Sequence, residues 1–161
     1  MIKKNLFLSS SFILLIFLID RISKMYVIHL DQKLLGSEIF SSKFLNINLI
    51  WNNGIAFGLL NFEKENLYNL LTALILIIII FIALMSINTK GFKKFSFLII
   101  LGGAIGNVFD RIFTKAVPDF IDFHIGNFHW FIFNIADIFI TIGLIFLILL
   151  EITDNNKIKK L

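Results

Sequence analysis

The sequence predicts an all-α membrane bundle of four transmembrane helices with a small β-rich cap on the extracytoplasmic face. Of the 161 residues, 58% are hydrophobic and only 16% are charged, and the mean hydropathy is +0.89. These values lie far from the average of soluble proteins. Four apolar stretches are long enough to cross a bilayer. We therefore expect one membrane-embedded domain that covers residues 1–161.

The four helices are expected at about residues 5–30, 67–87, 95–113 and 131–150. The second stretch carries no charge, and at about 1.5 Å per residue it covers a hydrocarbon core of roughly 30 Å. The third and fourth stretches each have a polar end. The first follows a Met-Ile-Lys-Lys start that is typical of a secretory signal, but no small-x-small cleavage site follows, which indicates an uncleaved anchor helix.

The lysine residues indicate how the helices are oriented. Eight of the fifteen basic residues lie before the first helix, between the second and third, or after the fourth. The two connections on the opposite side hold four lysines mixed with acids. Because basic residues are enriched in cytoplasmic segments, we expect both termini in the cytoplasm and the two connections outside it.

The two extracytoplasmic segments, at about residues 31–66 and 114–130, show strand patterns. Apolar and polar residues alternate between Leu45 and Asn52, which is typical of a half-buried strand. In the second segment, Gly126-Asn127 separates two apolar runs and favours a tight hairpin. These patterns predict the β-rich cap, although its Phe and Trp residues fit an interfacial aromatic belt equally well.

Ionisable residues within spanning helices require a role, because an unpaired charge there is unfavourable by several kcal/mol. Asp20 and Lys24 are four positions apart, so they share one helix face and are expected to form an ion pair. The pair either holds the first helix in the bundle or takes part directly in chemistry. Without further context the structural role is favoured.

The third helix carries glycines and polar residues on one stripe. Gly102 and Gly106 are four positions apart and allow a neighbouring helix to approach closely. Asn107, Asp110 and Arg111 lie within about one turn and serve either as interhelical contacts or as the lining of a polar cavity. An arginine at the outer headgroup level suits a phosphate or a peptide carbonyl.

Two further acids, Asp119 and Asp137, lie on segments that the hairpin turn brings back to the same membrane level. Asp119 is expected at the outer end of the third helix, and Asp137 lies one turn into the fourth, behind the favourable N-cap residue Asn134. Two neighbouring carboxylates share a proton, so one acts as base and the other as acid on a water molecule. Spacing alone is explained equally well by unrelated helix caps and headgroup contacts.

Other chemistries lack their motifs. There is no His-Glu-x-x-His, and His29, His124 and His129 have no metal-ligand spacing. The chain has no Gly-x-Ser-x-Gly elbow, no phosphate-binding glycine loop and no cysteine. We therefore expect no metal and no other cofactor. The net charge of +4 is attributed to loop topology and not to a nucleic-acid partner.

Several separated segments together resemble the lipoprotein signal peptidases, also called signal peptidase II, which are bacterial membrane aspartic proteases. The matching segments are Asp20 to Lys24, Asn52-Asn53-Gly54-Ile55-Ala56-Phe57, Gly102 to Arg111, Val117-Pro118-Asp119-Phe120 and Phe133-Asn134-Ile135-Ala136-Asp137. Their order and spacing match along nearly the whole chain. Arg21 and Pro118 occupy variable positions, and Trp130-Phe131-Ile132 replaces a Pro-containing stretch that is common in the family.

The resemblance implies that Asp119 and Asp137 are the catalytic dyad. Roles in binding the substrate or in supporting the site are implied for Asp20, Lys24, Asn52, Gly54, Asn107, Asp110, Arg111 and Asn134. Asp122 matches no catalytic position and is assigned to the loop.

The resemblance also implies a substrate class and a location. The implied partners are prolipoproteins whose cysteine already carries diacylglycerol, together with membrane lipids. Cleavage is expected just before that cysteine, at the outer surface level of a bacterial cytoplasmic membrane.

Two other classes of protein carry polar groups within membrane helices. A small proton-coupled transporter needs acids near mid-membrane, often in repeated halves, and neither pattern is present here. A non-catalytic assembly subunit explains the glycines and the ion pair but not two acids on converging outer segments. The level of Asp119 and Asp137 relative to the membrane therefore separates the peptidase from these alternatives.

Overall fold

The computed structural model describes residues 2–54 and 65–158 of the chain. Each of its helices contains a stretch long and apolar enough to cross a membrane. The helices are α1 (Ile2–Lys33), α2 (Glu65–Ile87), α3 (Gly91–Phe113) and α4 (Ile135–Ile158). The predicted four-helix bundle is confirmed.

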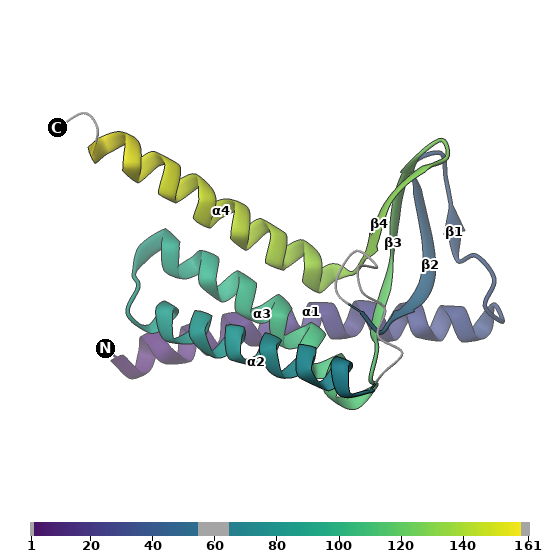
Figure 1. Cartoon of the computed structure of the whole chain (residues 1–161), viewed down its shortest axis with the longest axis horizontal. Helices are drawn as coiled ribbons and strands as arrows, with labels where there is room; N and C mark the ends of the chain where they lie inside the picture. Colours follow the sequence, from purple (N-terminus) through teal and green to yellow (C-terminus); the bar gives the residue numbers. More distant parts are fainter. Residues whose placement is uncertain (1, 55–64, 159–161) are drawn as a thin grey trace.

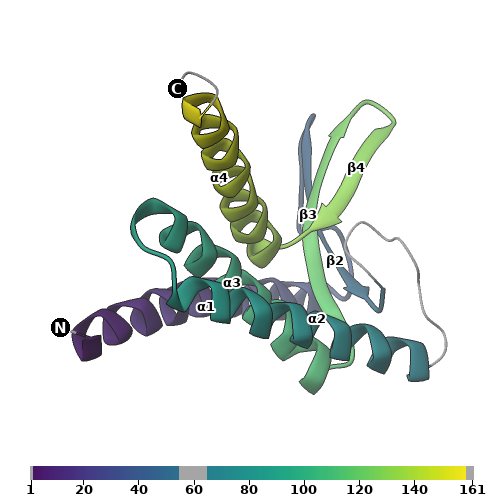
Figure 2. The same ribbon diagram turned by 60° about the vertical axis from the view of Figure 1, so that its left-hand side comes forward.

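Helix α3 is the centre of the bundle and packs against α1, α2 and α4 (Figure 1 and Figure 2). Its glycines explain this position. A Cβ at Gly102 would lie 2.6 Å from the Ile16 side chain of α1, and a Cβ at Gly103 would lie 2.5 Å from the Ala136 carbonyl of α4. Two neighbouring helices therefore approach the α3 backbone more closely than any larger residue permits.

A four-stranded antiparallel sheet in the order β1-β2-β3-β4 forms the predicted cap. Its strands are β1 (Phe40–Ser41), β2 (Leu45–Asn52), β3 (Val117–Ile125) and β4 (Phe128–Phe133). Gly126, with φ +59°, makes the turn between β3 and β4 at the predicted position. In Figure 1 the sheet lies at one end of the bundle, whereas both termini and the α2–α3 turn lie at the other.

The predicted start of the fourth helix at residue 131 is wrong. Residues 131–133 complete β4, where Phe133 pairs with Ile121, and α4 begins at Ile135. The boundary is Asn134, whose side chain caps the helix. An apolar run next to an apolar helix has no periodicity that distinguishes a strand from a helix. The sequence pattern therefore predicts the start of the fourth helix four residues too early. Asp119 likewise lies within β3 and not at the end of the third helix.

Candidate active site

The N-terminus of α4 organises the centre of the site. Asn134 Oδ1 accepts a hydrogen bond from the Asp137 amide at 3.1 Å, and Asp137 Oδ2 accepts one from the Asn134 amide at 3.1 Å. This reciprocal pairing is a capping box. Asp20 of α1 supplies a further acceptor, because its Oδ1 lies 3.1 Å from the Ala136 amide. The capping bonds fix both the start of α4 and the Asp137 carboxylate.

Asp119 faces this helix start from β3. Its side chain is almost fully buried, with 3% exposed. Oδ1 accepts a hydrogen bond of 2.6 Å from Asn134 Nδ2, and Oδ2 accepts one of 2.8 Å from Asn52 Nδ2 of β2. Asn52 Oδ1 in turn accepts from the Gly54 amide at 2.8 Å. The sheet and α4 together therefore hold the Asp119 carboxyl.

Both carboxyl groups line one small cavity. Its volume is about 20 Å³, which is enough for about one water molecule. The other lining residues are Asn52, Asn107, Arg111 and Val117. This is a place where a single water can contact both acids.

Arg111 brings a guanidinium to the same cavity. Its Nη2 donates to the Gly54 carbonyl oxygen at 2.5 Å. Within residues 2–54 and 65–158, its Nη1 is buried without a hydrogen-bond partner. A buried donor without an acceptor is unfavourable by about 1–3 kcal/mol, and an acceptor supplied by a bound molecule relieves this.

Lys24 connects the cavity to a buried cluster of charges. The predicted ion pair with Asp20 forms, with Nζ 2.9 Å from Oδ2, and both side chains are fully buried. Nζ also lies 2.8 Å from Asp110 Oδ2 and 2.8 Å from Asn107 Oδ1. All three donors of the ammonium are therefore used within the protein.

Arg21 completes this cluster. Nη1 and Nη2 lie 2.6 Å and 2.7 Å from the two oxygens of Asp110, which is a bidentate arrangement. Nη2 also lies 3.3 Å from Asp20 Oδ2. Two carboxylates and two cations give a cluster without net charge, as a buried site requires. The sequence places Arg21 only at a variable position, and no pattern in it predicts the contact with Asp110.

Gly106 allows Asp20 to enter the cluster. A Cβ on Gly106 would lie 2.5 Å from Asp20 Oδ2. Gly106, predicted to allow close packing of a neighbouring helix, therefore leaves space for the Asp20 carboxylate.

The charge state of the acids follows from these surroundings. Burial, together with the nearby Asp137 carboxylate, raises the pKa of Asp119 to about 6, although the hydrogen bonds from Asn52 and Asn134 oppose the rise. The proton of Asp119 is thus retained to higher pH than in an exposed aspartate. One acid of the pair can therefore hold a proton while the other is ionised.

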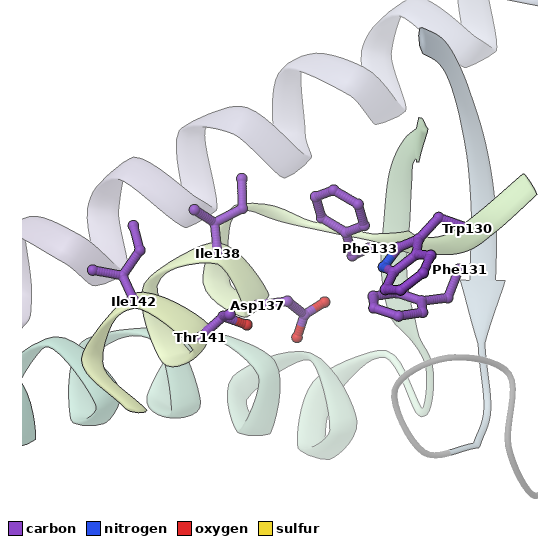
Figure 3. Close-up of a pocket in the computed structure, with 7 residues that line it drawn as sticks. All are labelled: Trp130, Phe131, Phe133, Asp137, Ile138, Thr141 and Ile142. Carbon is purple, nitrogen blue, oxygen red and sulfur yellow. The ribbon is translucent and has the colours of Figure 1, made fainter. Parts of the chain in front are cut away.

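Asp137 also borders a second, larger space, shown in Figure 3. This α4–β4 groove has a volume of about 250 Å³ and separates the start of α4 from the aromatic residues of β4. Its lining residues are Trp130, Phe131, Phe133, Asp137, Ile138, Thr141 and Ile142. Apart from Asp137 and Thr141 the lining is apolar.

The structure brings all the residues with implied roles into one connected site at the sheet end of the bundle. They are Asp20, Lys24, Asn52, Gly54, Asn107, Asp110, Arg111, Asp119, Asn134 and Asp137. Residues 55–57 of the Asn-x-Gly-x-Ala-Phe motif lie outside the described residues. Asp122 lies in β3 and not in a loop, and its Oδ2 is 2.8 Å from His129 Nδ1.

Two acids at the end of an apolar helix bundle border a cavity of the size of a water molecule, an arrangement that suits a membrane-embedded hydrolase. Comparison with known proteins identifies the family. The model of the signal peptidase II family matches residues 12–153. The chain belongs to the signal peptidase II family, and its enzymatic class is protease.

Individual relatives agree with this membership. A lipoprotein signal peptidase of Pelagibacter ubique is 48% identical, with 96% of this chain and 93% of the relative covered. One of Rickettsia akari is 40% identical over 92% of this chain and 76% of its own. Two solved bacterial membrane enzymes share the fold. One has a TM-score of 0.71 at 28% identity and covers 92% of this chain and 90% of its own. The other has a TM-score of 0.67 at 32% identity and covers 91% and 93%.

Proposed function

We propose that this protease removes signal peptides from prolipoproteins, by an aspartic mechanism in which Asp119 and Asp137 are the catalytic pair. The observation that carries the proposal is the shared cavity. Both carboxyl groups line a space of about 20 Å³, and each is held by hydrogen bonds from a different element. The bond that is cleaved precedes a cysteine that carries diacylglycerol.

The first half of the reaction adds water to the scissile carbonyl. Ionised Asp137 takes a proton from the water as its oxygen attacks the carbonyl carbon. Protonated Asp119 donates its proton to the carbonyl oxygen, which gives a neutral gem-diol. The raised pKa of Asp119, about 6, supports its assignment as the acid. Because the two acids share the proton, their roles are interchangeable.

The second half breaks the peptide bond. The proton on Asp137 passes to the leaving nitrogen, the C–N bond breaks, and a hydroxyl proton of the diol returns to Asp119. The products are the signal peptide with a free carboxyl group and the lipoprotein with a free amino group on its cysteine. The pair is then restored to its starting charge.

Arg111, Asn52 and Gly54 are assigned to the substrate backbone. Nη1 of Arg111 is buried at the cavity without a partner among the described residues, so a substrate carbonyl oxygen is a suitable acceptor. Asn52 and Gly54 hold the neighbouring segment, since Gly54 contacts both Asn52 and Arg111. These three residues bind and align the peptide.

Asn107 and Asn134 align the two acids, whereas Asp20, Lys24 and Asp110 support them. Lys24 fixes the Asn107 amide, which donates to Asp137 Oδ1 at 2.8 Å. Asp20 caps the start of α4, from which Asp137 projects. These supporting residues act through their neighbours and do not contact the reacting atoms.

The site is assigned to the extracytoplasmic side of a bacterial cytoplasmic membrane, with both termini in the cytoplasm. The lysine distribution supports this orientation. The fold is consistent with it, because the termini lie at the end of the bundle opposite the sheet (Figure 1). The partners are diacylglyceryl-modified prolipoproteins and membrane lipids.

A gel-shift assay tests the proposal. Purified protein in detergent is incubated with a diacylglyceryl-modified prolipoprotein, beside the variants Asp119→Asn and Asp137→Asn. Wild type alone is expected to cleave just before the lipidated cysteine, and both variants are expected to remain folded and inactive. Turnover by either variant contradicts the catalytic pair, and a folded wild type that does not cleave contradicts the function.

A further inference from the structure

Helix α2 carries none of the residues with implied roles, yet one of its side chains contacts the candidate site. Tyr68 lies near the start of α2, and this helix begins at the sheet end of the bundle (Figure 1). Tyr68 is 5% exposed, whereas Leu70, two positions further on, is 66% exposed. The tyrosine is therefore on the face of α2 that packs against α3, and the leucine is on the outer face.

Tyr68 contacts Arg111 at two points. Its hydroxyl donates a hydrogen bond of 3.3 Å to the backbone carbonyl oxygen of Arg111. This carbonyl belongs to the last turn of α3, where carbonyl groups lack the amide partner that a longer helix would supply. The tyrosine ring also faces the guanidinium, with 5.6 Å between Arg111 Cζ and the ring centroid, which is within the range of a cation–π contact. One side chain of α2 thus holds both the backbone and the head group of Arg111.

The Arg111 guanidinium is held at two different places. Nη2 donates to the Gly54 carbonyl oxygen, and the Tyr68 ring lies against the guanidinium group. Because a guanidinium is planar, a ring contact and a hydrogen bond at one edge together restrict both its tilt and its rotation. Nη1 is the donor that these contacts leave over. It is buried beside the water-sized cavity and has no partner in the part of the chain that the structure describes.

We infer that Tyr68 is a positioning residue for the substrate, and that it holds Arg111 so that Nη1 meets a carbonyl oxygen of the peptide backbone beside the scissile bond. The inference rests on the proposed function, which assigns Arg111 to that backbone. Tyr68 is not among the residues that line the cavity, so it acts through Arg111 and not on the reacting atoms. A guanidinium that is already oriented loses less freedom when the substrate binds, which favours binding.

NMR of the arginine side chains tests the Tyr68–Arg111 contact without any substrate. The chain contains two arginines, Arg21 and Arg111, so protein made with nitrogen-labelled arginine gives two Nε–Hε signals, which the variant Arg21→Lys assigns. Protons above an aromatic ring are shifted upfield by the ring current. Arg21 Cζ lies 5.1 Å from the ring centroid of Phe109, so the Arg21 signal is an internal reference for a contact of the same kind.

Tyr68→Leu is expected to move the Arg111 signal downfield and to leave the Arg21 signal in place, because only Arg111 loses its ring. Tyr68→Phe keeps the ring and is expected to keep most of the upfield shift. An Arg111 signal that Tyr68→Leu leaves unchanged overturns the inference. So does an equal movement of both signals, because Tyr68 then supports the bundle as a whole and not Arg111 in particular.

Kinetics with a lipidated prolipoprotein test what the contact does for the reaction. A backbone carbonyl is bound alike in the ground state and in the transition state, so weaker binding raises KM and leaves kcat nearly unchanged. Tyr68→Leu is expected to raise KM about tenfold, with kcat within about twofold of wild type. Tyr68→Phe loses only the hydroxyl and is expected to raise KM about threefold. A purely structural role gives the opposite pattern, because fewer folded molecules lower kcat and leave KM unchanged.

The matched control is Tyr26→Leu, which removes the other tyrosine of the chain at an exposed position on α1. Its kcat and KM are expected to stay within about twofold of wild type. A lower kcat without a higher KM in Tyr68→Leu, or an equal rise of KM in Tyr26→Leu, contradicts the positioning role. Failure of the proposed function appears instead as uncut substrate in wild type, whereas failure of the inference appears as normal cleavage with a KM that Tyr68→Leu does not raise.

Discussion

Lys24 and Asp137 are linked through a single carboxamide, that of Asn107. Lys24 Nζ lies 2.8 Å from Asn107 Oδ1, and Asn107 Nδ2 lies 2.8 Å from Asp137 Oδ1. An ammonium has only donors, so the amide oxygen must face Lys24 and the amide nitrogen must face Asp137. A buried charge on α1 thereby fixes a donor toward an acid on α4.

This link predicts that Asn107→Asp is nearly inactive. The new carboxylate still accepts from Lys24, but it presents an acceptor and a negative charge to Asp137, where a donor is required. We expect kcat/KM for lipidated prolipoprotein to fall about 100-fold or more. The matched control is Asn127→Asp at the exposed hairpin turn, where wild-type activity is expected. Activity of Asn107→Asp near that of the control would falsify the role of this donor.

The pH dependence of cleavage follows from Asp119. Burial raises its pKa to about 6, so the proton that the mechanism requires is present below this pH and is lost as the pH rises through it. We expect kcat/KM, measured from acid to alkaline pH, to fall on the alkaline side with an apparent pKa near 6 that belongs to the pair of acids.

Asn52→Leu is expected to move this alkaline limb to higher pH. Asn52 donates to Asp119 Oδ2 at 2.8 Å, and this bond favours the ionised form and lowers the pKa of Asp119. Its removal leaves the proton more tightly held. If kcat/KM of Asn52→Leu is reduced at every pH and the alkaline limb does not move, Asn52 only positions the neighbouring backbone.

The fold could be predicted from the sequence wherever one pattern dominated. A charge-free run defined α2, and alternation defined β2 from Leu45 to Asn52. The predicted start of α4 is wrong because the apolar run Phe131-Ile132-Phe133 fits a strand and a helix equally well. Only the pairing of these residues with β3 shows that they form a strand.

The candidate site was less accessible to sequence reasoning than the fold. The spacing of Asp119 and Asp137 left unrelated caps as an equal explanation, because nothing in the spacing shows that Asn134 contacts both. Arg21 was missed for a geometric reason. Adjacent helix positions point in different directions, but a long arginine side chain can turn back to a neighbouring helix, and here it reaches Asp110.

Gly106→Ala is expected to destabilise the protein and to inactivate it. The added Cβ would lie 2.5 Å from Asp20 Oδ2, so Asp20 must leave either Lys24 or the start of α4. Overpacking of this kind is expected to lower the free energy of unfolding by about 1–3 kcal/mol. Denaturant titration in detergent micelles measures this loss. The control is Ile105→Ala on the same helix, where Ile105 is 36% exposed. Equal stability of Gly106→Ala and wild type is the outcome that contradicts this account.

Arg21→Gln is expected to lower stability by about 2 kcal/mol, because it leaves two buried carboxylates with the single ammonium of Lys24. Arg21→Lys restores the charge but not the bidentate contact with Asp110, so we expect an intermediate value. The control is Lys93→Gln, which removes an exposed ion pair with Glu151 at 3.7 Å and is expected to change stability by less than about 1 kcal/mol. Unfolding titrations of the three variants and wild type decide the matter. If Arg21→Gln and Lys93→Gln lose equal stability, Arg21 is no more than a surface cation, and the neutral cluster around Lys24 does not depend on it.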